Sequence, residues 1–502
     1  MDAIVKAFAL IGDPQTLGLM LLAALFGLFV GSIPGLTATM ATALLIPFTF
    51  FMDPVPAIAV IVTTVATAIF AGDIPGALLR IPGTPASAAY CDESYAMTKK
   101  GLGERALGIA LVTSVIGGLV GSMVLSFSAP MLAEFAIQFS SYEYFWLACL
   151  GLSCAVIIST GSTLKGFVSL LIGLFIATVG IDGTAGYPRF TFGSVELMGG
   201  VSFIPAMIGM FAISEVLRYV ASNRLVIEVP PQTNGSVFAG LGPILKAYKF
   251  NIARGSTIGA VVGILPGAGA DIAAWIAFAI SKKRSKEPEK FGTGHPEGLV
   301  DAGAANNASL AGAWVPATVF GIPGDSITAI AIGVLYMKGM NPGPMVFIMN
   351  PELIYAVFLA FFIANLALLP LGYVAIKLSR HVLRIPRRVL MPIIVAFCMV
   401  GAFAINNTVF GISVMLVLGV LAYLMEENGF PVAPAILGIV LGNMVEDNFM
   451  ASMIKADGDP LGFFSRPIAA TLGVVTILVW VVPLVTAAMR WKSRMTNGNT
   501  IS

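Results

Sequence analysis

The segment Gly27-Leu-Phe-Val-Gly31-Ser-Ile-Pro34-Gly35 places a Pro-Gly pair inside apolar sequence, and Gly259-Ala-Val-Val-Gly263-Ile-Leu-Pro266-Gly267 repeats it 232 positions later. A Pro-Gly pair interrupts a helix and leaves backbone amide and carbonyl groups unpaired. At membrane depth such backbone is tolerated only where it is buried in protein or borders a water-filled cavity. The two segments therefore predict two broken helices at equivalent places in a membrane protein.

Two further landmarks recur in the same order. Ile81-Pro82-Gly83-Thr84 matches Ile322-Pro323-Gly324-Asp325 at a spacing of 241 positions, and Lys99-Lys100-Gly101 resembles Met337-Lys338-Gly339. Nearly constant spacing indicates an internal duplication of about 230–240 residues. We expect a first transmembrane repeat over residues 1–220, a linker over 221–251, and a second repeat with C-terminal spans over 252–502.

The arrangement of the two repeats bears on function. In membrane transporters such repeats are commonly inverted, and their interrupted segments meet at the binding site near the bilayer midplane. We therefore predict inverted repeats in which Pro34-Gly35 and Pro266-Gly267 face one another.

The composition sets the class of protein. Apolar residues make up 57% of the 502 residues and charged residues only 11%, whereas soluble proteins carry about 25% charged residues. Spans of about 20–25 residues would divide this apolar content into roughly 10–14 membrane segments. The prediction is an all-α polytopic membrane protein, which excludes a soluble enzyme, a nucleic-acid binder and a single-anchor receptor.

The charges cluster although the net charge is only +2. Basic residues gather at Lys282–Lys290, at Lys377–Arg388 and at Arg490–Arg494. Because positive residues flank membrane spans on the cytoplasmic side, all three clusters and the C-terminus are predicted to be cytoplasmic.

Polar residues around the breaks predict an anion site. Exposed amides at helix N-termini carry partial positive charge and bind carboxylates or phosphates. Each hydroxyl could instead bond to its own helix backbone. The predicted substrate-binding residues are Ser32, Pro34, Gly35, Thr37, Gly83, Thr84, Pro266, Gly267, Gly324 and Ser326.

Three acids in apolar sequence stand beside the breaks: Asp73, Asp271 and Asp325. Ionisable residues inside a membrane are costly and mark functional sites. They would repel an anion, so we expect them to carry a proton or, with Asn306 and Asn307, to bind a coupling cation through oxygen atoms. Interhelical hydrogen bonding is the alternative for the two asparagines. No other metal or cofactor is expected, and the absence of a phosphate-binding loop favours transport driven by an ion gradient.

A series of motifs runs along the chain: Gly31-Ser-Ile-Pro-Gly-Leu36, Ile46-Pro-Phe-Thr-Phe-Phe-Met-Asp-Pro54, Ile81-Pro-Gly-Thr-Pro85 with Asp92, Lys99-Lys-Gly101, Tyr187-Pro-Arg-Phe-Thr-Phe-Gly193, Gly209-Met-Phe-Ala-Ile-Ser-Glu215, Gly263-Ile-Leu-Pro-Gly267, Ala305-Asn-Asn-Ala308, Gly321-Ile-Pro-Gly324, Gly458-Asp-Pro460 and Phe464-Ser-Arg-Pro467. With these motifs, collinear from about residue 15 to 490, the sequence resembles the large membrane subunit, of the TctA type, of the tripartite tricarboxylate transporters.

The resemblance implies a multi-pass permease in a bacterial inner membrane, driven by a sodium or proton gradient. It also implies a small membrane subunit of about four helices and a periplasmic binding protein that delivers a tri- or dicarboxylate. Whether the complex forms a homodimer is left open by the resemblance, and we expect no nucleic-acid partner. This sequence departs from the family pattern at Asp73, Asp271 and Asp325, where hydroxyl residues are common, and at Gly303, where a Glu often precedes the asparagines. The extra acids favour a less charged substrate than citrate, a second coupling cation, or a substrate with a cationic group.

Two other functions remain as alternatives to an ion-coupled carboxylate importer. A passive organic-anion channel would use the duplicated breaks as its selectivity filter. An intramembrane enzyme would use Asp73, Asp271 and Asp325 as its carboxylates, although no close helical spacing pairs these acids. Our prediction is a transporter and not an enzyme.

Overall fold

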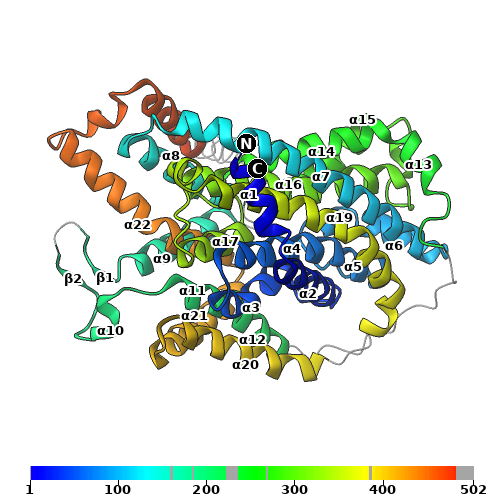
Figure 1. Cartoon of the computed structure of the whole chain (residues 1–502), viewed down its shortest axis with the longest axis horizontal. Coiled ribbons are helices and arrows are strands. Elements are labelled where there is room, and N and C mark those ends of the chain that lie inside the picture. Colours follow the sequence, from blue (N-terminus) through cyan, green and yellow to red (C-terminus); the bar gives the residue numbers. More distant parts are fainter. Residues whose placement is uncertain are drawn as a thin grey trace, which may run out of the picture.

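The computed structural model describes residues 2–158, 162–183, 186–221, 236–266, 269–383 and 387–481. In this part of the chain nearly all regular structure is helical, and the only sheet is a hairpin of two short antiparallel strands (Figure 1). The first half of the chain contains α1 (Asp2–Ile11), α2 (Pro14–Gly31), α3 (Ala38–Phe50), α4 (Pro54–Ala71), α5 (Asp73–Leu79), η1 (Ser87–Ala89), α6 (Cys91–Lys99), α7 (Gly103–Ala136), α8 (Ser141–Ile158), α9 (Thr163–Ala177), β1 (Gly180–Ile181), β2 (Pro188–Arg189), α10 (Val195–Met198), α11 (Phe203–Met207), the π-helical turn η2 (Ile208–Ile213) and α12 (Ser214–Ala221).

The second half is also helical. It contains α13 (Leu241–Ala247), α14 (Lys249–Ile264), α15 (Gly269–Arg284), η3 (Pro288–Lys290), α16 (Pro296–Phe320), α17 (Ser326–Met337), α18 (Pro344–Met349), α19 (Pro351–Val382), α20 (Arg387–Asn406), α21 (Val409–Glu427), α22 (Val432–Lys455) and η4 (Pro460–Phe464). Residues 222–235 of the predicted linker and the C-terminal basic cluster lie outside the described residues.

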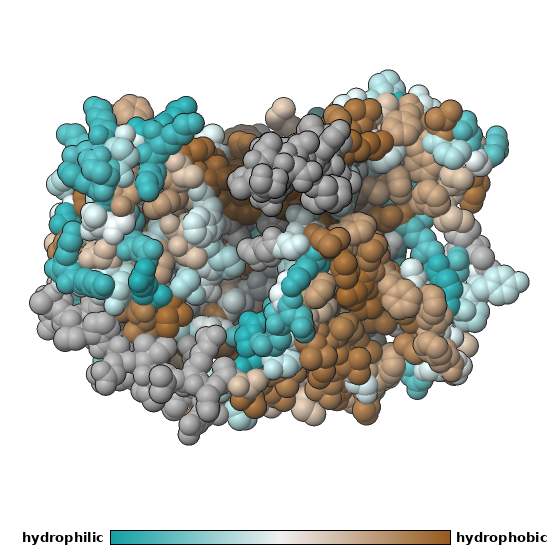
Figure 2. Space-filling view, turned by 180° about the vertical axis from the view of Figure 1, so that it is seen from behind, coloured by the Kyte–Doolittle hydropathy of each residue, from teal (hydrophilic) through white to brown (hydrophobic). Residues whose placement is uncertain are grey.

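Six segments are long and apolar enough to cross a membrane, and six shorter apolar helices accompany them in the described chain. The six long segments are Pro14–Gly31, Pro54–Leu79, Gly103–Ala136, Phe203–Ala221, Pro351–Ser379 and Val409–Glu427. On the face seen in Figure 2 the broadest apolar areas lie right of centre, and polar residues gather at the left, the edge that carries α6, α13 and α15 in Figure 1. These features confirm the predicted class of all-α polytopic membrane protein.

Corresponding helices of the two halves pack in the same way, α2 against α4 and α14 against α16. A Cβ atom on Gly27 would lie 2.4 Å from the carbonyl oxygen of Thr64, and one on Gly259 would lie 2.3 Å from that of Ala305. Glycine at both positions lets the helix backbones approach closely. The contacting partners, Thr64 and Ala305, are themselves 241 positions apart.

The turns at the second pair of breaks are also equivalent. The Ile81 amide donates to the Pro75 carbonyl at 3.3 Å, and the Ile322 amide donates to the Pro316 carbonyl at 3.3 Å. Each turn is preceded by a left-handed residue, Arg80 with φ 59° and Gly321 with φ 68°. The matched contacts support a duplication. Its boundaries and the inverted relation of the two halves stay predictions.

Two lysines from the third repeated landmark link each half to the other. The Lys100 Nζ donates to the Thr293 carbonyl at 2.6 Å. The Lys338 Nζ donates to the carbonyls of Phe50 at 2.9 Å and Met52 at 2.5 Å, at the C-terminal end of α3. Cations are favourable at helix C-termini because the unpaired carbonyls carry partial negative charge. The lysine that follows each broken region therefore holds a segment of the opposite half.

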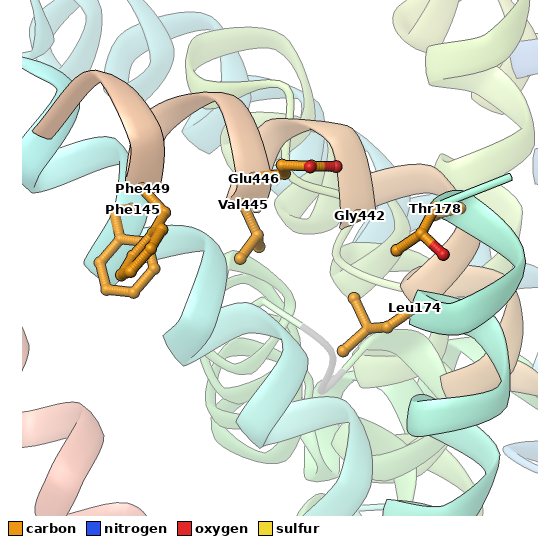
Figure 3. Close-up of a pocket in the computed structure, with 8 residues that line it drawn as sticks. Phe145, Leu174, Thr178, Gly442, Val445, Glu446 and Phe449 are labelled. Carbon is orange, nitrogen blue, oxygen red and sulfur yellow. The ribbon is translucent and has the colours of Figure 1, made fainter. Parts of the chain in front are cut away.

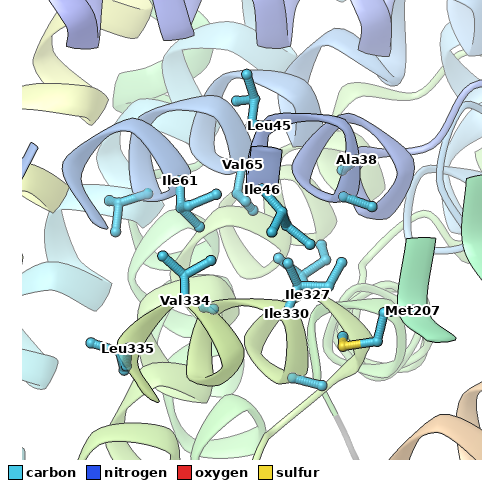
Figure 4. Packing of buried hydrophobic residues seen from close by; sticks show 14 of the residues in the cluster. Ala38, Leu45, Ile46, Ile61, Val65, Met207, Ile327, Ile330, Val334 and Leu335 are labelled. Carbon is cyan, nitrogen blue, oxygen red and sulfur yellow. The ribbon is translucent and has the colours of Figure 1, made fainter. Parts of the chain in front are cut away.

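An apolar layer fixes the broken helices that carry the polar residues. Side chains of α3 and α4, such as Ile46, Ile61 and Val65, face Ile330 and Val334 of α17 (Figure 4). All five side chains are buried. In lipid, helix association depends on close packing because lipid tails are as apolar as these side chains. The layer therefore places α3 and α17 side by side.

Candidate functional site

The Pro-Gly pairs interrupt the helices as predicted. Helix α2 ends at Gly31 and α3 begins at Ala38, and Gly35 adopts φ 86°. Helix α14 ends at Ile264 and α15 begins at Gly269. Gly267 lies outside the described residues. At each break a new helix begins, α3 after the first and α15 after the second.

The hydroxyls at the first break have different roles. The Ser32 hydroxyl is buried and donates to the Leu28 carbonyl at 2.6 Å, so it bonds to its own helix. The Thr37 hydroxyl caps α3 by accepting from the Met40 amide at 3.2 Å. Thr37 and Gly35 are partly accessible although Pro34 and Leu36 are buried. Thr37, rather than Ser32, therefore borders accessible space.

The second pair of breaks carries the same capping motif twice. The Asp325 carboxylate accepts from the Thr328 amide at 2.7 Å, and the Thr328 hydroxyl accepts from the Asp325 amide at 2.8 Å. In the first half, the Thr84 hydroxyl accepts from the Ser87 amide and the Ser87 hydroxyl accepts from the Thr84 amide, each at 3.1 Å. Such reciprocal bonds satisfy donors at a helix N-terminus. The predicted site residues Thr84 and Asp325 are thus held in equivalent turns.

Close approaches also fix the glycines of these turns. A Cβ atom on Gly83 would lie 2.6 Å from the Cα atom of Gly72, and one on Gly324 would lie 2.7 Å from the Cβ atom of Ala313. The Gly83 amide also donates to the Gly72 carbonyl at 3.0 Å. Gly83 and Gly324 therefore let each turn pack closely against the preceding helix. Both glycines are buried there.

Breaks of opposite halves touch one another. The hydroxyl oxygens of Thr39 in α3 and Ser326 in α17 lie 3.3 Å apart. The Trp275 indole of α15 donates to the Pro85 carbonyl at 3.1 Å. These contacts join the first break of each half to the second break of the other half. That Pro34 and Pro266 face one another stays a prediction.

The meeting point of α3 and α17 suits an anion. Both helices have eight residues or more and begin there, and Thr39 and Ser326 remain partly accessible at their first turns. Their N-terminal amides and hydroxyls are donors, and helix N-termini favour negative charge. The Asp325 carboxylate accepts a hydrogen bond from the first turn of α17, and its negative charge offsets the partial positive charge at that helix N-terminus. The cap of α3, Thr37, is neutral. The N-terminus of α3 therefore attracts an added anion more strongly.

The predicted cation residues lie in separate places. Asp73 and Asn306 are buried and joined through Tyr90, a residue that sequence reasoning missed because tyrosine carries no motif signal. The Tyr90 hydroxyl donates to Asp73 Oδ1 at 2.7 Å and accepts from Asn306 Nδ2 at 3.0 Å. Asp325 caps α17, and the side chain of Asp271 is outside the described part of the chain.

Asn307 faces different helices from its neighbour. Its amide donates to the Ser114 carbonyl at 3.3 Å and to Asn365 Oδ1 at 3.0 Å. The Asn365 amide continues to the Phe361 carbonyl at 2.8 Å. These contacts match the interhelical alternative. Among the described residues no group of three or more His, Cys, Asp or Glu side chains could hold a metal ion.

A cavity of about 260 Å³ lies elsewhere, among α8, α9 and α22 (Figure 3). The cavity lining is mostly apolar. Its one acidic residue, Glu446, forms a bidentate ion pair with Arg189, with Nη1–Oε1 and Nη2–Oε2 distances of 2.5 and 2.9 Å. An ion-paired carboxylate in an apolar wall offers an anionic substrate no donor. The broken helices, and not this cavity, are the candidate site.

Comparison with known proteins identifies the chain's relatives. A family model described as "Tripartite tricarboxylate transporter TctA family" matches residues 17–437. An Agrobacterium vitis protein described as an uncharacterized 52.8 kDa protein in the TAR-I ttuC' 3' region is 34% identical over 469 residues, which cover 92% of this chain and 91% of the relative. An uncharacterized protein in the TAR-II ttuC' 3' region of the same organism is 35% identical over 228 residues, covering 45% of this chain and 94% of the relative. No solved structure matches the chain.

The family match confirms several predictions at a coarse level. The family is a family of transporters, and its name denotes a complex of three components. A small membrane subunit and a binding protein are therefore partners of the large subunit. The apolar helices make the chain a multi-pass membrane protein. This chain belongs to the tripartite tricarboxylate transporter TctA family, as the large membrane subunit of such a transporter.

Proposed function

We propose that this subunit imports an organic tri- or dicarboxylate across a bacterial inner membrane, driven by a sodium or proton gradient. The substrate binds between the broken helix tips, at the N-termini of α3 and α17. The periplasmic binding protein delivers it, and the basic clusters and the C-terminus face the cytoplasm.

One observation carries the proposal for the binding site. Thr39 and Ser326 come from different halves, yet their hydroxyl oxygens lie 3.3 Å apart at two helix N-termini. A carboxylate there could accept from both hydroxyls and from neighbouring amides. Because the two helices belong to different halves, movement of one half relative to the other would assemble or separate the donors, which alternating access requires.

Ion coupling is proposed for the acids and amides beside the breaks. Carboxylate and amide oxygens are ligands of hard cations. The proposed coupling residues are Asp73, Asp271, Asn306, Asn307 and Asp325. Asp73 and Asn306 are the pair that the structure joins, through Tyr90.

Reconstituted transport tests the binding site. The chain is placed in vesicles with its small membrane subunit, the binding protein is added outside, and uptake of radiolabelled di- and tricarboxylates is measured under a sodium or a pH gradient. We expect the variants Thr39→Ala and Ser326→Ala to weaken substrate affinity. Losing one hydrogen bond to a charged group costs about 1.5–3 kcal/mol, roughly tenfold to hundredfold in KM.

A matched control lies on the same helix. The Thr42 hydroxyl is buried and donates to the Ala38 carbonyl at 2.7 Å, so it bonds only its own helix. Thr42→Ala should leave KM within about twofold, because it removes no donor from the space between α3 and α17. Equal loss in all three variants would contradict the proposed site. If uptake depends on neither the sodium gradient nor the pH gradient, the passive channel is favoured instead.

A further inference from the structure

Three buried polar side chains form a continuous chain between the two halves. Asp73 begins α5 and is 4% exposed, Tyr90 precedes α6 and is 1% exposed, and Asn306 in α16 is 1% exposed. Two hydrogen bonds of 2.7 and 3.0 Å connect them. Phe70, Ile74 and Ala77 belong to the same buried cluster as Tyr90.

The direction of the two bonds is fixed by proton count. A phenol has a single proton to donate. The Tyr90 hydroxyl gives that proton to Asp73 Oδ1, so it must accept from the amide group of Asn306. The Asn306 amide nitrogen therefore donates to Tyr90, and its side-chain carbonyl oxygen, Oδ1, takes no part in these two hydrogen bonds.

Two oxygens are left over by this arrangement. Asp73 Oδ2 and Asn306 Oδ1 are buried, and no residue that the structure describes donates a hydrogen bond to either. The described ion pairs also give Asp73 no Lys, Arg or His partner. An ionised buried carboxylate without a partner is strongly unfavourable, so such a group is normally paired, bound to a metal ion or neutralised by a proton. Both leftover atoms are oxygens of the kind that hard cations prefer.

We infer that Asp73 Oδ2 and Asn306 Oδ1 are two ligands of one sodium-type monovalent cation site, with Tyr90 as the positioning residue between them. This inference rests on the proposed ion-coupled function and narrows it to one place. The remaining coordination comes from backbone or water oxygens.

The second half cannot repeat this site. The position 241 after Asp73 is Trp314, and the position 241 before Asn306 is Val65. Neither side chain supplies an oxygen. The residues at these equivalent positions cannot form the same pair, and the inferred site combines one residue pair from both halves.

The site is linked to the substrate region through one residue. Gly72 precedes Asp73, and its carbonyl accepts from the Gly83 amide at 3.0 Å in the turn that presents Thr84. A cation held by Asp73 therefore stabilises the end of α4 on which this turn rests. Occupancy of one site would then favour the ordered form of the other, which is a coupling between two ligands.

Cation binding can be measured without transport. The intact chain with its small membrane subunit is purified in potassium-free, sodium-free buffer, and its Tm is followed as NaCl, KCl or choline chloride is added at constant ionic strength. A ligand that binds only the folded state raises stability in proportion to the logarithm of its concentration above Kd. We expect sodium, and not choline, to raise Tm in a saturable way.

Variants test whether the sodium-dependent rise in Tm comes from this site. Asp73→Asn and Asn306→Ala should abolish the sodium-dependent rise, and Tyr90→Phe should weaken sodium binding about tenfold, because the ligands survive but lose their common partner. The matched control is Thr318→Ala on the same helix, whose buried hydroxyl donates only to the carbonyls of Trp314 and Val315 in its own helix. It should retain the sodium response even where its starting Tm is lower.

The outcomes separate this inference from the proposed function. A full sodium response in Asp73→Asn, or a response to pH alone, overturns the cation site. If Asp73→Asn does not fold, equilibrium binding of ²²Na⁺ to Tyr90→Phe and Thr318→Ala decides, and equal affinity in the two variants overturns the cation site. If sodium raises the Tm but uptake does not depend on sodium, the cation site is supported and sodium coupling of transport is contradicted.

Discussion

Asp325 shows what a single residue does at the break in the second half. Its carboxylate accepts from the amide and hydroxyl of Thr328, at 2.7 and 2.8 Å, and so begins α17. From the sequence, an acid in apolar surroundings indicated only a cation or proton role. The capping role could not be read from Asp325 alone, because it depends on where the helix restarts.

Replacing the cap should destabilise the protein by a small, defined amount. We expect Asp325→Ala to lower the free energy of unfolding by about 0.5–2 kcal/mol, because the first turn of α17 loses its acceptor. Asp325→Asn keeps an acceptor oxygen and should lose less. Thermal unfolding of the purified subunit complex measures both. An Asn variant as unstable as the Ala variant would show that the charge, and not the cap, matters.

At the scale of elements, small residues decide how closely helices cross. The repeated glycines at positions 27 and 259 begin the two matched segments of the sequence. The structure shows that each lies against the backbone of one partner helix, α4 or α16. The sequence predicted the repetition, but the partner helix became visible only once the chain was folded.

Enlarging one of these glycines should disturb the α2–α4 contact. In Gly27→Ala the new methyl group would meet the Thr64 carbonyl at 2.4 Å, whereas in Gly18→Ala, on the same helix, it would meet nothing within 4 Å. We expect Gly27→Ala to cost about 1–3 kcal/mol, since overpacking forces backbone shifts. Gly18→Ala should leave Tm unchanged or raise it. Equal Tm values in the two variants would contradict the close contact between α2 and α4.

At the scale of the whole molecule, charge divides the two ends. The basic segment Lys282–Lys290 follows α15 at the polar edge, near α6 and α13, whereas the β1–β2 hairpin and α10 extend at the opposite end (Figure 1). From the positive-inside rule we predict that the polar edge faces the cytoplasm. We further predict that the hairpin lies on the opposite, periplasmic side, where the proposed delivery by the binding protein would take place.

Cysteine labelling tests this orientation. In a chain whose four native cysteines are replaced, Lys283→Cys and Phe192→Cys introduce single exposed thiols, and Phe192 is 91% exposed. We expect a membrane-impermeant maleimide added to intact cells to label the Phe192→Cys thiol and to spare the Lys283→Cys thiol until the membrane is opened. Labelling of both thiols from the same side would reject the orientation.

The sequence by itself determined the class of the molecule, the repeated landmarks and the positions of the helix breaks, because apolar composition and Pro-Gly pairs act locally along the chain. Only the tertiary structure decided that Thr39 meets Ser326, that Ser32 bonds its own helix, and that Asn306 and Asn307 face different neighbours. Tyr90 carries no local signal, yet it joins Asp73 to a residue 216 positions away from itself. Contacts between the halves depend on how packed helices bring distant residues together, and residue spacing within one segment does not contain that information.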